Sequence, residues 1–254
     1  MNEKLTSEEM EDEGYSKMKA ENFLPEIKSK ESILREKCGE EGYQKLSELN
    51  NPAVTDFIAK YLKLCNPKSV FVRANAGEDA EYIRKRSIEL GEERQLDMEG
   101  HTAHFDGYND QARDKENTKF LFPPEKELGP QFNNIDKEKG LEEIHGYLKN
   151  IMEGKEAYIL FLCLGPKESI FSVPVLQITD STYVAHSEDM LYRDGYELFK
   201  RRELEEKDDF FKFVHSAGTL ENGVSKEIDK RRVYTDLNSK TVYSTNTQYG
   251  GNTL

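Results

Sequence analysis

Apolar positions spaced three or four residues apart predict helices in four parts of the chain. The clearest helix begins at Asn51-Pro52, where an N-cap residue is followed by proline at the first helical position, and it ends before Asn66-Pro67. A glycine directly after the segment 78–90 indicates a second helix that ends there. Two further helices are predicted at about 141–154 and 182–199.

Extended runs lie between these helices. Residues 69–73 and 118–122 read as short strands. The run 158–164 is apolar at every position, which is typical of a central strand that is covered on both faces. A strand at 171–179 contains Pro174, which favours a place near an edge or a bulge, because proline cannot donate to a sheet ladder.

A hairpin is predicted near the end of the chain. It pairs residues 232–236 with 241–245 through the short connection 237–240. Strands that alternate with helices predict an α/β fold, with a mixed sheet flanked by helices.

The first fifty residues differ from the rest in composition. They are dense in Glu and Lys, their apolar positions are scattered, and Gly39 and Gly42 interrupt any long helix. We therefore expect residues 1–50 to form a charged, solvated helical arm and residues 51–254 to form one main domain.

The formal net charge of the chain is -13. Sequence-independent binding to nucleic acid, or binding to an anionic membrane, requires surplus Lys and Arg. We therefore expect neither partner. A small anionic metabolite is still compatible with this charge, because a few focused Arg side chains and backbone N–H groups reverse the potential locally. The chain begins without the basic and apolar regions of a signal peptide, and no segment approaches transmembrane length, so the cytoplasm is the expected compartment.

Two groups of residues resemble reactive sites at first sight. His101 and His104, with Asp106, have the composition of a metal site, but residues three apart on an extended segment point to opposite faces, so we expect no metal there. His215 has no recognisable Ser or Cys nucleophile beside it, and we expect a turn histidine bonded to backbone rather than a general base. Neither a disulfide framework nor a thiolate zinc site is suggested by the three widely spaced cysteines, Cys38, Cys65 and Cys163.

Two segments combine residue types that suit an anionic ligand. Gly250 and Gly251 allow positive φ and close approach of the backbone, and their consecutive N–H groups can form a concave nest for an anion. Arg113 precedes a predicted strand, where its guanidinium fork could hold a carboxylate or a phosphate. From these residues alone, however, Arg113 is more simply a surface charge, and a Gly-Gly-Asn run is ordinary turn chemistry.

Three segments together carry a resemblance to one enzyme family. The first is 111–118, a short A-R-containing stretch that includes Arg113. The second joins the Gly-Pro turn within 164–169 to the T-D-S-T-Y-V run within 178–184, where side-chain oxygens suit the cap of the following helix.

The third segment is the most specific of the three. It is the H-S-A-G turn within 214–218, which is followed, after the predicted hairpin, by Tyr249-Gly250-Gly251-Asn252. In this order and at about this spacing, the segments resemble GTP-dependent phosphoenolpyruvate carboxykinases. The resemblance covers about 51–254.

This resemblance implies an activity and a set of substrate-binding residues. The family is a class of carboxy-lyases of gluconeogenesis that convert oxaloacetate and GTP to phosphoenolpyruvate, CO2 and GDP. By the resemblance, Arg113 would clamp the substrate carboxylate or the product phosphate, and Tyr249 would pack on the substrate or a metal-bound ligand. The backbone of Gly250 and Gly251 would approach the carboxylate, and Asn252 would offer an amide.

The resemblance also implies that the remaining chemistry is supplied by another part of the enzyme. The family's metal ligands, for manganese or magnesium, and its GTP-binding P-loop lie after the segment that corresponds to Leu254, and no G-x-x-x-x-G-K-[S/T] motif occurs here. We therefore expect a truncated N-terminal domain that is inactive alone, and we assign no catalytic residue within it. Two alternatives remain: a non-catalytic acidic α/β interaction domain that binds protein through its charged arm, and the ATP-using class of carboxykinases.

Overall fold

The computed structural model describes residues 29–75, 77–105, 107, 114–123, 129, 131–167, 169–201 and 209–248. The helices are α2 (Lys30–Glu48), α3 (Pro52–Cys65), α4 (Glu78–Glu89), α5 (Lys137–Leu148), α6 (Thr182–Leu191), α7 (Tyr196–Arg201) and the short 3-10 helix η3 (Ile228–Lys230). The strands of the main sheet are β1 (Ser69–Val72), β4 (Thr118–Phe122), β5 (Asn134–Asp136), β6 (Glu156–Leu164), β7 (Val173–Thr179), β8 (Arg193–Asp194), β9 (Phe211–Ser216), β12 (Arg232–Asp236) and β13 (Thr241–Thr245). Two small hairpins pair β2 (Arg94–Gln95) with β3 (Thr102–Ala103) and β10 (Leu220–Glu221) with β11 (Val224–Ser225).

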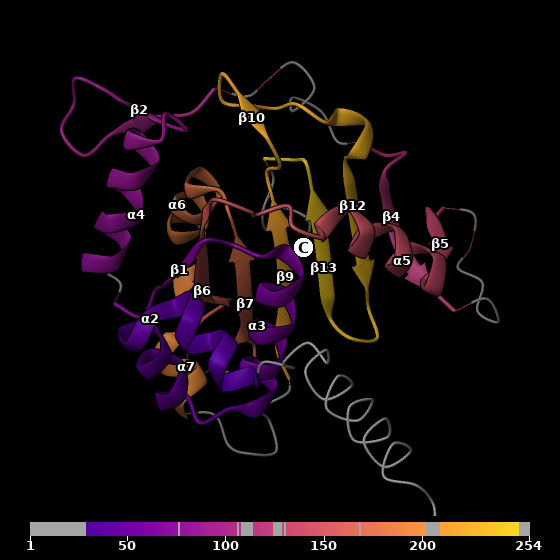
Figure 1. The fold of residues 1–254 in the computed structure, drawn as a ribbon, viewed down its shortest axis with the longest axis horizontal. Coiled ribbons are helices and arrows are strands. Elements are labelled where there is room, and N and C mark those ends of the chain that lie inside the picture. Colours follow the sequence, from indigo (N-terminus) through magenta and orange to yellow (C-terminus); the bar gives the residue numbers. More distant parts are fainter. Residues whose placement is uncertain are drawn as a thin grey trace, which may run out of the picture.

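The main sheet is mixed, and its strand order is β1-β6-β7-β9-β13-β12-β4-β5, with β8 paired to β6 (Figure 1). β7, β9 and β13 run parallel to one another, whereas β6 is antiparallel to β7 and β12 is antiparallel to β13. β4 is parallel to β12. Helices lie on both faces of this sheet, so the predicted α/β fold with a mixed sheet flanked by helices is confirmed.

Successive side chains of a strand point to opposite faces of the sheet, so the hydrophobic core has one part on each face. On β6, Ile159 and Phe161 pack with helices α2, α3, α5 and α7, while Leu160 and Leu162 pack on the other face with α4 and α6. Every residue from Ala157 to Cys163 is buried, as the uninterrupted apolar run predicted. The strand therefore supports both layers.

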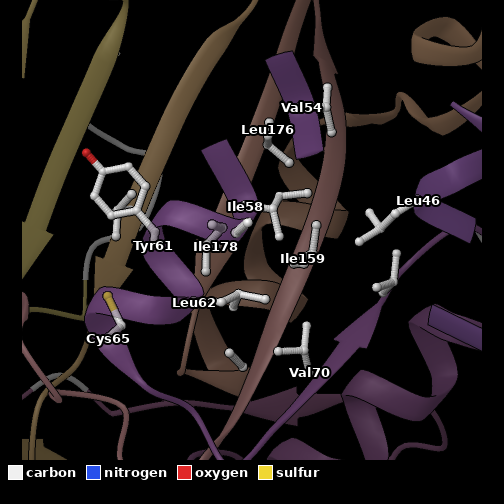
Figure 2. Close-up of a cluster of buried hydrophobic side chains, with 14 of the residues drawn as sticks. Leu46, Val54, Ile58, Tyr61, Leu62, Cys65, Val70, Ile159, Leu176 and Ile178 are labelled. Atoms are coloured by element: carbon white, nitrogen blue, oxygen red, sulfur yellow. The ribbon is translucent and has the colours of Figure 1, made fainter. Parts of the chain in front are cut away.

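Helix α3 packs one face on the sheet. Val54, Ile58 and Leu62, at successive i, i+4 positions, are fully buried and face the sheet side chains of Ile159 and Leu176 (Figure 2). The helix begins as predicted, with the Asn51 side chain accepting from the N–H groups of Ala53 and Val54, and it ends at Asn66 in the left-handed conformation.

The expectation of a solvated arm is wrong for Lys30–Glu48. This segment is helical, and Gly39 interrupts it with non-helical dihedrals as predicted, but Leu34 and Leu46 are buried in the main core. Gly42 does not break the helix. A Cβ at Gly42 would lie 3.2 Å from a methyl of Val72, so the missing side chain lets α2 approach β1 closely.

Two other expectations need correction. The predicted helix 182–199 is two helices, α6 and α7, because β8 forms between them and pairs with β6. Pro174 does not lie at a sheet edge, since β7 has neighbours on both sides. It is tolerated because the pairing of β9 with β7 begins only at Val175, so Pro174 lies beyond the end of that ladder.

The remaining predicted elements agree with the structure. The strands at 69–73 and 118–122, the helix at 78–90 and the hairpin formed by β12 and β13 are all present. The predicted helix at 141–154 is shorter and displaced toward the N-terminus, as α5. Cys38, Cys65 and Cys163 are buried free thiols. No helix in the described part of the chain is long and apolar enough to cross a membrane.

The packing of α2 predicts a clear stability result. Leu34→Ala and Leu46→Ala should each lower the free energy of unfolding by about 2–5 kcal/mol, because each removes a buried side chain and leaves a cavity. Gln44→Ala, at an exposed position of the same helix, should change it by less than about 0.5 kcal/mol. Urea unfolding followed by circular dichroism measures all three. Equal, small changes would show that α2 is solvated after all.

Candidate functional site

The carboxyl ends of β7, β9 and β13 meet at one edge of the sheet, because these three neighbouring strands are parallel. The residues that end them are polar and almost completely buried. They are Thr179, Asp180, Ser181, His215, Ser216, Thr245, Asn246, Thr247 and Gln248. In an open α/β sheet, ligands bind outside the carboxyl ends of the strands. Tyr249 follows directly on this buried layer, so we take this edge as the candidate site.

Asp180 joins two of these strand ends. Its Oδ2 accepts from the hydroxyl of Ser216 at 2.6 Å and from Lys155 Nζ at 2.6 Å, and its Oδ1 accepts from the N–H of Ala217 at 2.9 Å. Lys155 Nζ also donates to the carbonyl of Gly218 at 2.6 Å. A buried carboxylate is tolerated here because a cation and several donors surround it.

His215 fixes the chain just before the predicted binding loop. The Thr179 hydroxyl accepts from the N–H of Ser181 at 3.1 Å, so its own proton is free to be donated to His215 Nδ1 at 2.7 Å. His215 Nε2 then donates to the carbonyl of Thr247 at 2.7 Å. Burial lowers the pKa of His215 below its ordinary value of 6.5, which agrees with a neutral ring carrying its proton on Nε2. The expected backbone bond of this histidine is confirmed, and the ring links β7, β9 and the segment after β13.

Glu92 caps the N-terminus of α6. Its carboxylate accepts from the N–H groups of Thr182 and Tyr183, at 3.2 and 3.1 Å, and from the hydroxyl of Ser181 at 2.5 Å. Ser181 is itself the N-cap and accepts from Val184 N–H, so the predicted capping role of this turn is confirmed. A negative charge at this helix end is favourable because it opposes the positive end of the helix dipole.

Glu93 holds the β2–β3 hairpin against α6. Its carboxylate accepts from Thr102 Oγ1 at 2.7 Å, bonds His186 Nδ1 at 2.8 Å and contacts the hydroxyl of Ser87. Burial raises the pKa of Glu93, but the hydrogen bonds from His186, Ser87 and Thr102 outweigh burial and hold the pKa below its ordinary value. Glu92 and Glu93 together therefore fix the segment that leads into β2 and β3.

Gln248, the last described residue, lies between the two small hairpins. Its Oε1 is 3.2 Å from His104 Nε2, and its amide nitrogen donates to the carbonyl of Gly223 in the β10–β11 turn. His104 Nδ1 is 2.6 Å from the carbonyl oxygen of Glu92, and its ring stacks on Tyr183 with centroids 3.5 Å apart. Both hairpins lie beyond the same end of the main sheet, as the positions of β2 and β10 at the top of Figure 1 show.

A compact turn follows Arg113. Asp114 accepts from the N–H of Asn117 at 3.1 Å and from its side-chain amide at 2.8 Å, and its carbonyl accepts from the Thr118 hydroxyl at 2.6 Å. The carbonyl of Asn117 in turn accepts from the N–H of Val233 at 2.9 Å. This turn is therefore fixed to β12 at the start of β4.

The register of the sheet brings this turn to the candidate site. Val233 pairs with Thr118 on one side and with Ser244 on the other, so the start of β4 and the end of β13 lie at the same level. They are separated by two strand spacings, roughly 10 Å. Asp114 lies four residues before Thr118, and Tyr249 lies five residues after Ser244.

The predicted binding residues themselves, Arg113, Tyr249, Gly250, Gly251 and Asn252, lie outside the described residues. Their chain neighbours Asp114 and Gln248 are described and converge on one edge. Within the described residues, no group of three His, Cys, Asp or Glu side chains could hold a metal ion. His104 is bonded to backbone and to an amide, and Asp106 lies outside the described part.

Sequence reasoning missed the roles of Glu92, Asp180, His104 and Gln248. Asp180 stands in the T-D-S turn, where only a helix cap was expected. His104 was considered only as a metal ligand. The partners of these side chains lie in other elements, and only the tertiary structure brings them together.

Comparison with known proteins agrees with this geometry. Residues 56–254 match the family model described as phosphoenolpyruvate carboxykinase N-terminal domain. A phosphoenolpyruvate carboxykinase (GTP) of Thermococcus sibiricus is 55% identical over 88% of this chain and 36% of its own length. A protein of the same name from Pyrococcus horikoshii is 52% identical over 87% of this chain and 35% of its own length. One from Chlamydia abortus is 29% identical over 78% of this chain and 34% of its own length.

This chain thus spans about a third of the length of the curated relatives that it matches. The family model covers well over half of the chain, and it includes the main sheet with both flanks of the candidate site. The chain belongs to the phosphoenolpyruvate carboxykinase N-terminal domain family.

Proposed function

We propose that this chain forms the substrate-binding part of a GTP-dependent phosphoenolpyruvate carboxykinase. The enzyme would convert oxaloacetate and GTP to phosphoenolpyruvate, CO2 and GDP. The observation that carries the proposal is the sheet register around Val233, which brings the flanks of Arg113 and of Tyr249 to one edge. The names of the relatives support the choice of reaction and of nucleotide.

The chemistry explains why these residue types would meet. Loss of CO2 from oxaloacetate leaves the enolate of pyruvate, and the enolate oxygen then attacks the γ-phosphoryl group of GTP. Cationic and N–H donors must hold this anion in place while water is excluded. Arg113 would clamp a carboxylate or phosphate through two parallel hydrogen bonds, which suit its planar fork.

Residues 249–252 would complete the part of the substrate site that this chain supplies. Gly250 and Gly251 would bring backbone N–H groups close to the carboxylate, since neither carries a side chain that blocks approach. Tyr249 would pack on the bound substrate, and Asn252 would offer its amide. The buried contacts of His215 and Gln248 support this role, because they fix the chain directly before the loop.

GTP and a divalent metal ion such as manganese or magnesium are implied by the family. The described residues contain no group of three ligands that fits a metal ion, so we assign no step through the metal to them. We infer that both groups are held by the remaining part of the enzyme. We likewise propose a cytoplasmic enzyme, with no nucleic acid or membrane as partner.

The alternatives have less support. An interaction domain that binds protein through a charged arm needs that arm to be free, but Lys30–Glu48 packs into the core. The ATP-using class is disfavoured because the relatives carry GTP in their names.

Steady-state assays test the proposed function directly. The full-length carboxykinase that contains this chain should form phosphoenolpyruvate from oxaloacetate only when GTP and a divalent metal ion are both present. Coupled detection of the product measures the rate, with ATP in place of GTP as the matched comparison. Absence of turnover with either nucleotide would refute the proposal, and preference for ATP would refute the nucleotide assignment.

Substitution of Arg113 tests its role. In the full-length enzyme, Arg113→Lys should lower kcat/KM for oxaloacetate nearly as much as Arg113→Ala, because an ammonium group cannot replace a bidentate fork. Loss of one charged hydrogen bond, worth roughly 1.5–3 kcal/mol, corresponds to a decrease in kcat/KM of about 10- to 150-fold. Lys115→Ala, at an exposed position two residues later, is the control. Near wild-type kcat/KM in Arg113→Lys would make Arg113 a surface charge.

The buried His215 predicts a pH-dependent stability. Its folded pKa is lowered below 6.5, so protons bind preferentially to the unfolded chain. The stability contribution is therefore complete above pH of about 6.5 and is lost as the pH falls below that value, by up to about 1.4 kcal/mol per pH unit. Denaturant unfolding at pH 7.5 and 5.5 should show a smaller decrease for His215→Gln than for the wild type. Parallel decreases would mean that His215 is protonated when folded.

A further inference from the structure

The β2–β3 hairpin has an inner face that is held against the rest of the chain. Thr102 Oγ1 donates to the carboxylate of Glu93 at 2.7 Å, and the ring of His104 stacks on Tyr183 of α6 with centroids 3.5 Å apart. A two-stranded hairpin is marginally stable by itself in water, so these contacts keep the hairpin in one position beyond the end of α4 (Figure 1).

The outer face of the hairpin carries different side chains. Arg94 pairs with Ala103, and this pair is adjacent to the one that contains Thr102. Successive side chains of a strand point to opposite faces, so Arg94 lies on the face opposite to Thr102. Leu96 and Phe105, each two residues further along, share this outer face. The guanidinium carbon of Arg94 is 5.8 Å from the centroid of the Phe105 ring, which agrees with this alternation.

Large apolar side chains are exposed on this outer face and at the turn beside it. Leu96 is 46% exposed, Phe105 is 69% exposed, and Met98 in the turn is 64% exposed. A single exposed apolar residue is ordinary, whereas a group of them marks an interaction surface. Aromatic residues and Met are also enriched in interfaces between proteins. We call Leu96, Met98 and Phe105 the hairpin apolar face.

A second group of exposed apolar side chains lies toward the opposite end of the main sheet. Ile170 and Phe171 belong to the turn that follows β6, which is antiparallel to β7. Met190 and Leu191 end α6, which leads from the carboxyl end of β7 to β8. β8 pairs with β6 at Leu162, which is the level of the start of β7. The two exposed groups are thus separated by about the length of the sheet.

The course of the polypeptide indicates what covers the hairpin apolar face. This chain spans about a third of the length of its relatives, and it matches the N-terminal domain of the family, so most of the remaining polypeptide of those relatives follows the matched part. Gln248 Oε1 is 3.2 Å from His104 Nε2. The segment that follows Gln248 therefore starts beside the hairpin and not at the opposite end of the sheet.

A second copy of this chain is a less suitable occupant. Each copy carries a formal net charge of -13, and two such chains repel each other. The following part of the same polypeptide is tethered beside the hairpin, which raises its effective concentration there.

We propose that the hairpin apolar face is an interdomain docking surface, covered in the full-length enzyme by apolar side chains of the polypeptide that follows this domain. An acidic side chain at the rim of that partner surface would pair with Arg94. The proposal rests on the proposed function only in that it takes this chain as part of a longer carboxykinase. Docking on the outer face would join the following part of the enzyme to α6, because the inner face of the same hairpin is already fixed there.

Oxidation of two methionines tests the proposal, since Met98 and Met190 are 64% and 67% exposed in this chain. In the full-length enzyme, hydrogen peroxide should oxidise Met98 roughly tenfold or more slowly than in the urea-unfolded enzyme, because a covered thioether reacts only when the interface opens. Met190, at the other exposed group, is the matched control and should react at nearly the unfolded rate. Peptide mass spectrometry measures both rates. Oxidation of Met98 as fast as in the unfolded enzyme would overturn the proposal.

Substitutions on the hairpin provide a second test. Leu96→Asp and Phe105→Asp each place a carboxylate in the covered interface, so each should return the oxidation of Met98 to nearly the unfolded rate. Both side chains are exposed within this chain, so its own core stays intact. Leu191→Asp is the control and should leave Met98 protected. Unchanged protection in both hairpin variants would overturn the proposal, and so would wild-type protection that disappears on dilution, which would assign the face to a second copy.

The oxidation of Met98 is measured without reference to turnover, so the two proposals are tested separately. Protection of Met98 in a full-length protein that does not convert oxaloacetate would support the docking surface and refute only the proposed function. An unprotected Met98 in an active enzyme would refute only the docking surface.

Discussion

The need to pair buried polar groups at the carboxyl ends of β7, β9 and β13 governs this structure. Water cannot reach most of these groups, so each donor and acceptor requires a partner from the protein itself. Asp180 and Glu92 supply acceptors, while Lys155 and the N–H groups of α6 supply donors. Each pair joins segments that are far apart in sequence. The polar layer therefore fixes the relative positions of strand ends, helix α6 and the two small hairpins.

Two histidines hold the segment that follows β13, each through different partners. His215 has one donor and one acceptor as neighbours, so a neutral ring satisfies both. His104 lies between the carbonyl oxygen of Glu92 and the side-chain amide of Gln248. Both rings hold the same segment, at Thr247 and at Gln248. A sequence pattern that counts histidines does not reveal these partners, because they lie far from the two rings in the chain.

Most elements of the main sheet followed from periodicity, but β5, β8 and β9 were not predicted. The packing of α2 did not, because its frequent Glu and Lys residues conceal a narrow stripe that includes Leu34 and Leu46. The break between α6 and α7 also depended on tertiary structure. A Cβ on Gly195 would lie 2.5 Å from the carbonyl oxygen of Leu162, and this close approach allows β8 to reach β6. The family and the binding residues were predicted from motifs, but the buried residues beside those motifs were found only from the tertiary structure.

For the proposed binding site, the sheet register would lower the energetic cost of binding a substrate. Ordering a loop residue costs about 1–2 kcal/mol of backbone entropy, so a free segment would offset much of the interaction with a small substrate. Here the flanks are ordered by folding itself: Asp114 anchors the end of one segment to β4, and Gln248 anchors the start of the other between the hairpins. The entropy of fixing these ends is lost during folding and is offset by burial of the core. In the proposed enzyme, flanks that are already ordered would leave more of the binding energy for holding the substrate in a reactive position.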